Sequence, residues 1–470
     1  MEEELKKIFA GAADFQIRKL TAGGCRMTLY FLDGLTSGGE LAEDVLRPLE
    51  RLEPDAPEKL LERALSGAVW CASAERAEDA RTAAEKLVNG YCVLCIEGCE
   101  AAACYEVKTG EKRSPSAPES ENTVKGAKDA FTETIRTNTS LVRRHLRTPD
   151  LRLIQVTVGR RSLTNVTILY IEGLTDPTMV VRMQQRLESI DIDGLIAPSA
   201  VEEYVTGSRK TAFPLLEYTE RTDKLCQGLL SGRVGLLVDG LPLGYLAPVT
   251  LAKLMESQED RAVDYVSASC LRVLRYAALL IGLLLPALYA AMAMFHQEML
   301  PTKLLMAIIE SKKDVPFPTI LEVLGILAAF ELLQEAGLHL PQAIGTAVSI
   351  IGGLVVGTAA VDAKLVSPAA LIVAASSGIC GFTLPSRDLS DAIRVWRFAL
   401  VLLAGAAGLY GVTVGFLLLV IHLAGLESMG CAYLSPFSGA RTGHALLRER
   451  LSKQKYRDAE LHPQDERNQA

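Results

Sequence analysis

The sequence has few of the residues from which catalytic and metal sites are built. Its 470 residues include six histidines and two tryptophans, and the histidines are scattered along the chain. It contains no Gly-x-Ser-x-Gly elbow, P-loop, His-Glu-x-x-His pair or dinucleotide-binding fingerprint. We therefore predict no catalytic residue, and we expect neither enzyme activity nor a cofactor nor a bound metal ion.

The sequence also lacks an excess of basic residues. Its 49 Lys and Arg residues stand against 56 Asp and Glu, which gives a formal net charge of -7. Nucleic-acid binding needs a concentrated basic face, so no nucleic-acid partner is expected. Residues 1–7 lack the basic start and the apolar core of a cleaved signal peptide. Membrane insertion is therefore expected to use later segments.

Long hydrophobic runs, by contrast, fill the C-terminal third of the chain. Hydrophobic residues make up 49% of the sequence, and four stretches after Arg275 contain no Lys, Arg, Asp or Glu. These stretches are residues 276–295, 336–361, 365–386 and 398–426. A bilayer core of about 30 Å needs about 20 apolar residues of helix to cross it. The runs predict an all-α polytopic membrane domain with four to six helical segments.

The basic residues around these runs predict where the ends of the membrane domain lie. Arg272 and Arg275 precede the first run, and a basic tail over residues 437–470 follows the last. Because positive residues favour the cytoplasmic side, both ends are predicted to be cytoplasmic, which requires an even number of crossings. Counting residues 398–426 as one span would place the arginines of residues 387–397 outside. One segment is therefore expected to be re-entrant or half-buried.

A further helix is predicted over residues 316–335. Glu322, Glu331 and Glu335 alternate there with apolar residues, as they do in an amphipathic helix. Such a helix would lie in the membrane interface or line a polar cavity. Glu331 and Glu335 are the candidate acidic residues at the membrane interface.

The second hydrophobic run is rich in small residues. Gly345, Gly352 and Gly357 are candidates for helix packing, and Gly353-Leu-Val-Val-Gly357 is a small-xxx-small motif. The alternative is a pore-lining helix whose hydroxyl groups and glycine face a water path, with charged residues at its mouth. The candidate pore-lining residues are Thr346, Ser349, Gly353, Thr358, Asp362 and Lys364. The sequence leaves both interpretations open.

The part before the membrane domain repeats itself. Residues 28–36, an apolar strand that ends in Asp-Gly-Leu-Thr, return as residues 167–175 with Glu-Gly-Leu-Thr. Residues 90–98 return in the same order as residues 232–240. Each copy contains a strand that ends in Asp-Gly or Glu-Gly, then a helical segment, then a hairpin strand. This order predicts two similar α/β lobes with mixed sheets. For Asp33 and Glu172, a turn or cap is favoured over acid/base chemistry, because both precede the glycine that ends a strand.

The predicted fold is thus a duplicated α/β cytoplasmic domain followed by an all-α polytopic membrane domain. The predicted boundaries are residues 1–107 for the first lobe, 108–150 for a linker and amphipathic helix, 151–255 for the second lobe, 256–436 for the membrane domain and 437–470 for the basic cytoplasmic tail.

Two features within the lobes have competing interpretations. The arginine-rich helix over residues 131–147 is typical of a solvated surface, or it contacts a neighbouring subunit or anionic lipid. Cys92 and Cys95 have the spacing of a zinc site, together with Cys99 and Cys104. Because Cys92 and Cys95 lie inside an apolar strand whose counterpart in the second lobe has no cysteine, buried core cysteines are favoured.

An ordered series of short motifs remains. Its members are Pro118-Glu119-Ser120-Glu121, Arg136-Thr137-Asn138, Gly159-Arg160-Arg161, Tyr170-Ile171-Glu172-Gly173, Tyr218-Thr219-Glu220-Arg221, Gly232-Arg233-Val234, Leu284-Leu285-Pro286, Val315-Pro316-Phe317-Pro318, Phe330-Glu331-Leu332-Leu333 and Tyr433-Leu434-Ser435-Pro436. In this order the chain resembles the A subunits of the spore germination receptors, the GerA family, over nearly its whole length.

The resemblance implies a subunit of a nutrient receptor in the inner membrane of a bacterial spore. It implies two partners, a transporter-like B subunit that binds the germinant and a lipoprotein C subunit. It also implies a homo-oligomer in the membrane lipid that acts as a channel and releases monovalent cations when germinant binds. Two alternatives stay open: a secondary transporter, although the duplication lies outside the membrane domain, and a scaffold that docks B and C without conducting.

Overall fold

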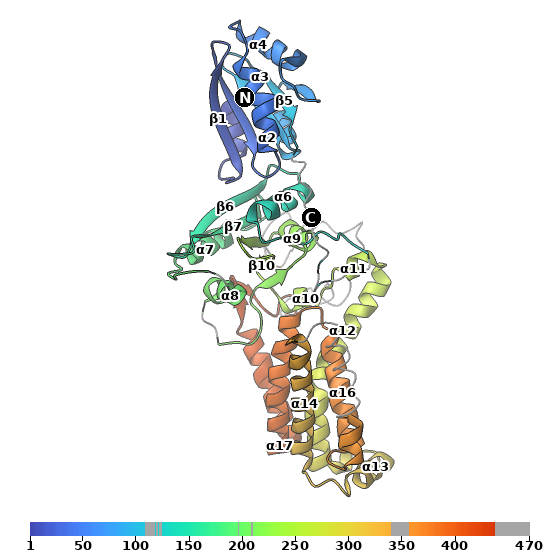
Figure 1. The fold of residues 1–470 in the computed structure, drawn as a ribbon. Helices are drawn as coiled ribbons and strands as arrows, with labels where there is room; N and C mark the ends of the chain where they lie inside the picture. Colours follow the sequence, from blue (N-terminus) through green and yellow to red (C-terminus); the bar gives the residue numbers. More distant parts are fainter. Residues whose placement is uncertain are drawn as a thin grey trace.

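The computed structural model describes residues 1–108, 118, 121, 125–195, 197–207, 210–339 and 357–437. Three parts follow one another along the long axis of the molecule (Figure 1). Lobe 1 lies at one end, lobe 2 lies in the middle, and a helical domain forms the other end.

Lobe 1 is built around a five-stranded sheet with helices on both faces. Its elements are α1 (Glu2–Ile8), β1 (Phe15–Ala22), β2 (Cys25–Leu32), α2 (Gly38–Glu40), η1 (Leu41–Leu46), α3 (Arg47–Glu50), α4 (Pro57–Arg63), η2 (Ala64–Ala68), β3 (Ala74–Ala77), α5 (Ala80–Val88), β4 (Tyr91–Ile96) and β5 (Ala102–Glu106). Helices α1 and α5 cover one face, and the segments from η1 to η2 cover the other. Because both faces are covered, every residue of β4 is buried.

Lobe 2 repeats this arrangement. Its elements are α6 (Ile135–His145), β6 (Leu151–Val158), β7 (Thr164–Ile171), α7 (Pro177–Glu188), α8 (Pro198–Thr206), β8 (Glu217–Thr219), α9 (Thr222–Leu230), β9 (Val234–Val238), β10 (Gly244–Ala247) and α10 (Leu251–Leu254). The strand order β6-β7-β9-β10-β8 matches the order β1-β2-β4-β5-β3 of lobe 1. Helices α7 and α8 pack on one face of the sheet, while α6 and α9 pack on the other. The predicted fold class, two similar α/β lobes before a helical region, is confirmed.

The sheets differ from the expected mixed sheets in one detail, since all strand pairs described in them are antiparallel. In lobe 1, β3, α5 and β4 form a βαβ unit whose two strands run in the same direction. The hairpin strand β5 lies between them and pairs with both. Strand β10 lies in the same way between β8 and β9.

The repeated acidic-Gly motif forms the same turn in both lobes. Gly34 and Gly173 have φ angles of 87° and 77°, a conformation that glycine adopts without steric cost. Asp33 pairs with Arg136, and Glu172 pairs with Arg152. Both carboxylates therefore lie in turns, as the sequence predicted. Each also forms an ion pair with an arginine.

Helix α6 joins the two lobes through its arginines. The buried Arg143 donates from Nε and Nη2 to the two carboxylate oxygens of Asp14 in lobe 1, at 2.8 and 2.9 Å. At the same contact, the backbone amide of Ala13 donates to the carbonyl of Leu153 at 2.9 Å. Arg143 thus holds the lobes together, while Arg144 and Arg147 are exposed, as on the solvated surface that the sequence predicted.

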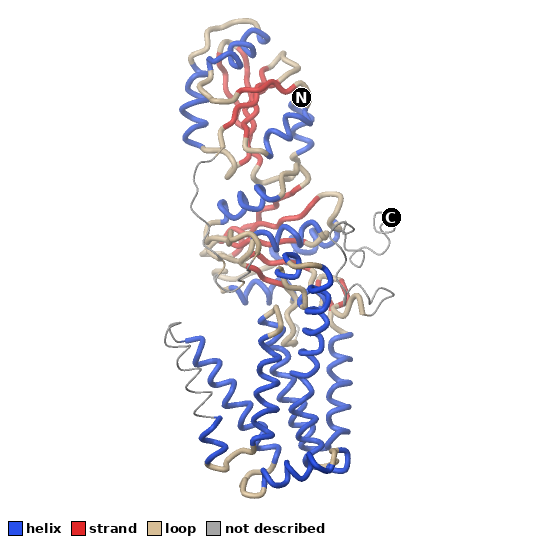
Figure 2. Tube along the Cα trace, turned by 90° about the vertical axis from the view of Figure 1, so that its right-hand side faces the viewer, coloured by secondary structure: helices blue, strands red, loops and turns tan. Residues whose placement is uncertain are grey.

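The helical domain extends from lobe 2 as packed helices (Figure 2). Its elements are α11 (Glu259–Ala262), α12 (Tyr265–Met294), η3 (Gln297–Met299), α13 (Thr302–Lys312), α14 (Thr319–His339), α16 (Pro368–Phe382) and α17 (Arg387–Ala424), and it is followed by the hairpin β11 (Glu427–Ser428) and β12 (Cys431–Ala432). Among the described residues, α12 and α17 are long and apolar enough to cross a membrane, by length and composition.

Helix α17 is folded back on itself. Its backbone leaves the helical region at Ala407 and Gly408, where φ is -136° and 59°. The rings of Trp396 and His422 consequently lie 5.7 Å apart, although a straight helix would separate these residues by about 39 Å. Residues 398–426 therefore do not form one straight span, because this stretch contains the turn of a helical hairpin.

The hairpin moves the arginines at the start of α17 to the side of lobe 2. Glu202 of lobe 2 lies near Asp388, and burial together with the Asp388 charge raises the pKa of Glu202 to about 7. Arg272 and Arg275 of α12 also contact the lobe-2 side, through Glu256 and Asp260. The conflict with the positive-inside rule therefore disappears, since these basic residues share one side of the helical domain.

Candidate functional site

The predicted pore-lining and packing residues fall into two groups. Five of them lie outside the described residues and stay predictions: Gly345, Thr346, Ser349, Gly352 and Gly353. The other four, which are Gly357, Thr358, Asp362 and Lys364, precede α16.

Gly357 is buried, and a Cβ there would lie 3.6 Å from Leu371, an ordinary contact distance. Thr358, Asp362 and Lys364 are exposed, and Lys364 pairs with Asp314 in the loop after α13. This end of the helical domain is opposite lobe 2 (Figure 1). The described part thus places the two predicted mouth charges away from the lobes.

A polar network connects four helices of the helical domain. Arg397 of α17 is buried and donates to Glu331 of α14 at 2.5 Å and to Ser377 of α16 at 3.0 Å. Ser377 in turn donates to the carbonyl of Gly282 in α12 at 2.6 Å. Arg394 lies 2.8 Å from the second oxygen of Glu331. We call these five residues the four-helix network.

Glu331 and Glu335 have different environments in this arrangement. Glu331 is half-buried between two arginines, whereas Glu335 is exposed and lines a cavity beside the network. Glu322 lies on the opposite face of α14, because nine residues correspond to two and a half turns of helix. There Glu322 is buried, accepts the backbone amide of Ser367 and lies 3.5 Å from Lys312. The three glutamates therefore do not form the single polar face that the sequence indicated.

The joint between lobe 2 and the helical domain is formed by the chain after α17. Ser428 of β11 donates to the carbonyl of Leu215 at 2.7 Å and accepts the amide of Val249 at 3.0 Å. On the side of α12, Arg275 contacts both oxygens of Asp260 at 2.6 and 2.7 Å. Both ends of the helical domain are therefore bonded to lobe 2 or to the segment directly after it.

Several motifs of the resemblance meet in lobe 2. Glu121 of the linker lies 2.8 Å from Lys224 and accepts from Thr219. Lys224 also contacts Glu217 at 3.0 Å, and Glu217 contacts Arg233 at 2.7 Å. Burial opposes the charge on Glu217, but Lys224 and Arg233 outweigh it and hold its pKa at about 2. These residues fasten the linker to the lobe.

The contact of Asp129 with His145 and Thr222, at the end of the linker, predicts how the stability of the lobes depends on pH. Asp129 lies 2.6 Å from both His145 and Thr222, and the hydrogen bond with His145 lowers the pKa of Asp129 to about 2 and raises that of His145. The Asp129 contribution is present above its unfolded pKa, about 4, and is lost below it. The His145 contribution is full below about pH 6.5 and is lost as the pH rises through its raised pKa.

We therefore expect the thermal midpoint of the lobes to fall at alkaline pH as the imidazolium of His145 is lost. A series of melts from pH 5 to pH 9 checks this. His145→Gln should flatten the alkaline fall of the thermal midpoint. An unchanged alkaline profile in this variant would contradict a stabilising contact between Asp129 and His145.

The cysteines of the candidate zinc spacing lie in the two hydrophobic cores of lobe 1. Cys92 faces the core under the segments from η1 to η2, while Cys95 and Cys104 face the core under α1 and α5. A spacing of three in a strand points two side chains to opposite faces, so Cys92 and Cys95 cannot chelate one ion. Burial raises the pKa values of Cys95 and Cys104 to about 12, which keeps both thiols protonated.

The fold and these sites define a class of protein in which two fused α/β lobes are joined to an apolar helical domain with internal ion pairs. A family profile described as "Bacillus/Clostridium GerA spore germination protein" matches residues 3–460. The chain belongs to this family.

Individual proteins are also similar to this chain. The chain is 34% identical to spore germination protein KA of Bacillus subtilis, over 95% of this chain and 83% of that protein. It is 35% identical to the uncharacterized membrane protein YfkQ of Bacillus subtilis, over 93% of this chain and 85% of that protein. Among solved structures it is similar to the N-terminal domain of the A subunit of the Bacillus megaterium spore germinant receptor GerK3. That match has 26% identity and a TM-score of 0.41, and it covers 53% of this chain and 92% of the other.

Proposed function

We propose that this chain is the A subunit of a nutrient germinant receptor in the spore inner membrane and that it forms an oligomeric channel for monovalent cations. The family match over residues 3–460 is the observation that carries the proposal. A B subunit that binds the germinant and a lipoprotein C subunit are the proposed partners. The apolar helices α12 and α17 support the membrane location.

The proposed orientation places both lobes in the cytoplasm. Arg272 and Arg275 of α12 lie on the lobe-2 side, as does the start of α17 with Arg394 and Arg397. Cytoplasmic placement of this side agrees with the preference of basic residues for the cytoplasm.

The proposed coupling runs from lobe 2 to the helices. Ser428 donates to the carbonyl of Leu215, and Arg275 donates to the carbonyl of Met255 at the end of lobe 2, so a movement of lobe 2 shifts α12 and α17 together. The four-helix network then transmits this shift to α14 and α16. Germinant binding opens the channel only if it favours the open arrangement over the closed one. The pore helix proposed for this channel contains Ser349 and Gly353.

Spores in which this chain, with its B and C subunits, is the sole nutrient receptor test the receptor role. We expect an added nutrient mixture to trigger release of monovalent cations from these spores, and we expect no release when this chain alone is deleted. Release that persists without the chain would contradict the proposal. The non-conducting scaffold is the second candidate, and it predicts that pore-helix substitutions leave cation release unchanged.

A further inference from the structure

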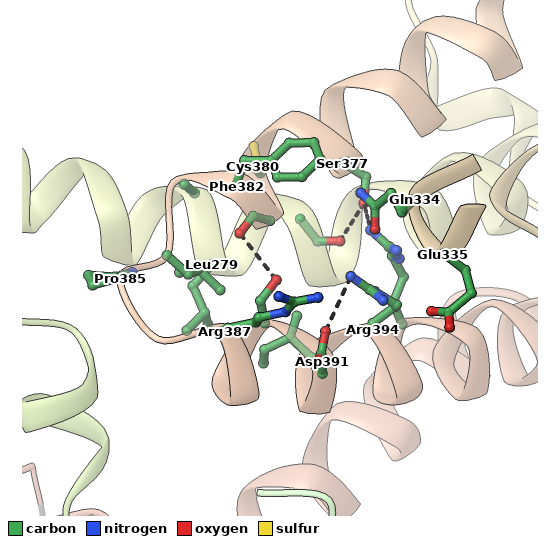
Figure 3. A pocket seen from close by; sticks show the side chains of 18 of the residues that line it. Leu279, Gln334, Glu335, Ser377, Cys380, Phe382, Pro385, Arg387, Asp391 and Arg394 are labelled. Atoms are coloured by element: carbon green, nitrogen blue, oxygen red, sulfur yellow. Dashed lines mark hydrogen bonds and ion pairs between the residues drawn. The ribbon is translucent and has the colours of Figure 1, made fainter. Parts of the chain in front are cut away.

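A cavity of about 600 Å³ lies among four helices of the helical domain. It is lined by residues of α12, α14, α16 and the start of α17 (Figure 3). Arg387, Asp391 and Arg394 are spaced by four and three residues, so they follow one face of α17 along the cavity wall. Phe382 at the end of α16 and Gln334 of α14 line other parts of the cavity wall.

The cavity lies where the charged and the apolar parts of the helices meet. The apolar run of α12 begins after Arg275, which pairs with Asp260. Gly282, the deepest α12 residue in the lining, is seven residues further along, or about 10 Å at the helical rise per residue. The charged start of α17 likewise ends at Arg397, where its apolar run begins. Charged and apolar surfaces therefore meet at the cavity.

Cationic donors remain available in this cavity. Arg387 is exposed and has no ion-pair partner in the part of the chain that the structure describes. Arg397 is 5% exposed, and its Nε donates to no acceptor among the described residues. Arg394 divides its charge between Glu331 at 2.8 Å and Asp391 at 3.2 Å. The carboxylates thus form ion pairs with Arg394 and Arg397, whereas Arg387 forms none among the described residues and interacts with the Asp388 charge only at longer range.

One large apolar side chain of the lining is exposed, and others are exposed elsewhere on α16 and α14. Phe382 in the lining is 68% exposed, and Ile379, one helical turn before it, is 62% exposed. On α14, Leu332 next to Glu331 is 71% exposed. A ligand with a small anionic group and long apolar chains would contact both surfaces at once. A free anion would leave these side chains uncovered.

We propose that this cavity binds the phosphate headgroup of an anionic phospholipid. Arg387 supplies the main charge and the Nε of Arg397 a deeper hydrogen bond, while the acyl chains leave the cavity past Phe382. Basic pockets between helices on the cytoplasmic side are suited to such headgroups. The site rests on the proposed membrane location and does not depend on conduction.

The test uses the purified full chain, delipidated in neutral detergent. Dioleoyl phosphatidylglycerol is titrated while the thermal midpoint is measured, with dioleoyl phosphatidylcholine and glycerol 1-phosphate in parallel. We expect only phosphatidylglycerol to raise the midpoint. Arg387→Gln should require about fivefold more of this lipid, as expected for one lost cation at an anionic headgroup. Lys303→Gln removes an exposed charge from α13, at the other end of the helical domain, and should behave as wild type.

Equal protection by phosphatidylcholine, or the same titration for Arg387→Gln and Lys303→Gln, would overturn the proposal. Protection by glycerol 1-phosphate at the same concentration would overturn the lipid as the ligand. If Arg387→Gln fails to fold, a photoreactive phosphatidylglycerol on the wild-type chain replaces it. Labelling of the peptides around Phe382 and Arg387 supports the site, and labelling elsewhere alone refutes it. No step measures ion flux, so failure here leaves the channel proposal intact.

Discussion

Replacing Gly411 with alanine is expected to destabilise the helical domain by about 3 kcal/mol, as overpacking does where a backbone has to move. An added Cβ at Gly411 would lie 2.0 Å from the carbonyl oxygen of Leu403. Leu403 and Gly411 lie on opposite arms of the α17 hairpin, and a backbone oxygen cannot rotate away as a flexible side chain can. The arms must therefore separate, which also disturbs the close contact between Gly415 and Leu400.

Unfolding of the purified chain in a series of mixed detergent and SDS micelles measures this effect. Gly425→Ala is the matched control, because a Cβ at Gly425 meets only ordinary contacts at 3.6 Å and its φ is -83°. The hairpin would be contradicted if the two alanine variants unfolded at the same SDS fraction.

Replacing Arg397 with leucine is expected to cost about 3 kcal/mol as well, the loss typical of a hydrogen-bonded charge in a buried network. The guanidinium bonds Glu331 and Ser377 at 2.5 and 3.0 Å. Leucine would leave Glu331 with Arg394 as its remaining cation and would remove the donor to Ser377. The contacts from α17 to α14 and α16 should loosen together.

Arg394→Leu provides the comparison for this prediction. Its side chain is about a third exposed, so solvent screens its ion pairs and the expected loss is below about 1 kcal/mol. The same SDS unfolding series compares both variants with wild type. A larger loss for Arg394→Leu than for Arg397→Leu would show that the network is not organised around Arg397.

The duplicated lobes were predictable because their signal is local and repeated. An apolar strand that ends in acidic-Gly occurs twice, and Gly34 and Gly173 adopt the positive φ that this turn needs. The antiparallel order was not predictable in the same way. It depends on β5 and β10 entering between two strands, a pairing between segments that no local pattern specifies.

The hairpin in α17 was missed because hydrophobicity alone does not distinguish one long span from two shorter arms. A signal was present in the spacing of Gly405, Gly408, Gly411 and Gly415. Gly405 approaches Ile320 of α14, and Gly408 occupies the turn with φ 59°. Small residues at intervals of three and four allow backbones to approach closely.

The candidate site was predictable only in part. The sequence singled out Glu331 and Glu335 as acidic residues at the membrane interface, since ionisable residues within apolar helices need a partner or a cavity. Their partners were not predictable, because Arg394 and Arg397 lie more than 50 residues further along the chain and meet Glu331 only through helix packing.

Ion flux through liposomes that contain the purified chain with its B and C subunits tests the central claim most directly. We predict that germinant opens a flux of monovalent cations. We also predict that Ser349→Leu and Gly353→Leu reduce this flux while the oligomer stays intact by size-exclusion chromatography. Flux unchanged by both substitutions would move the pore lining to other residues. No flux with all three subunits and germinant present would contradict the channel and favour the scaffold.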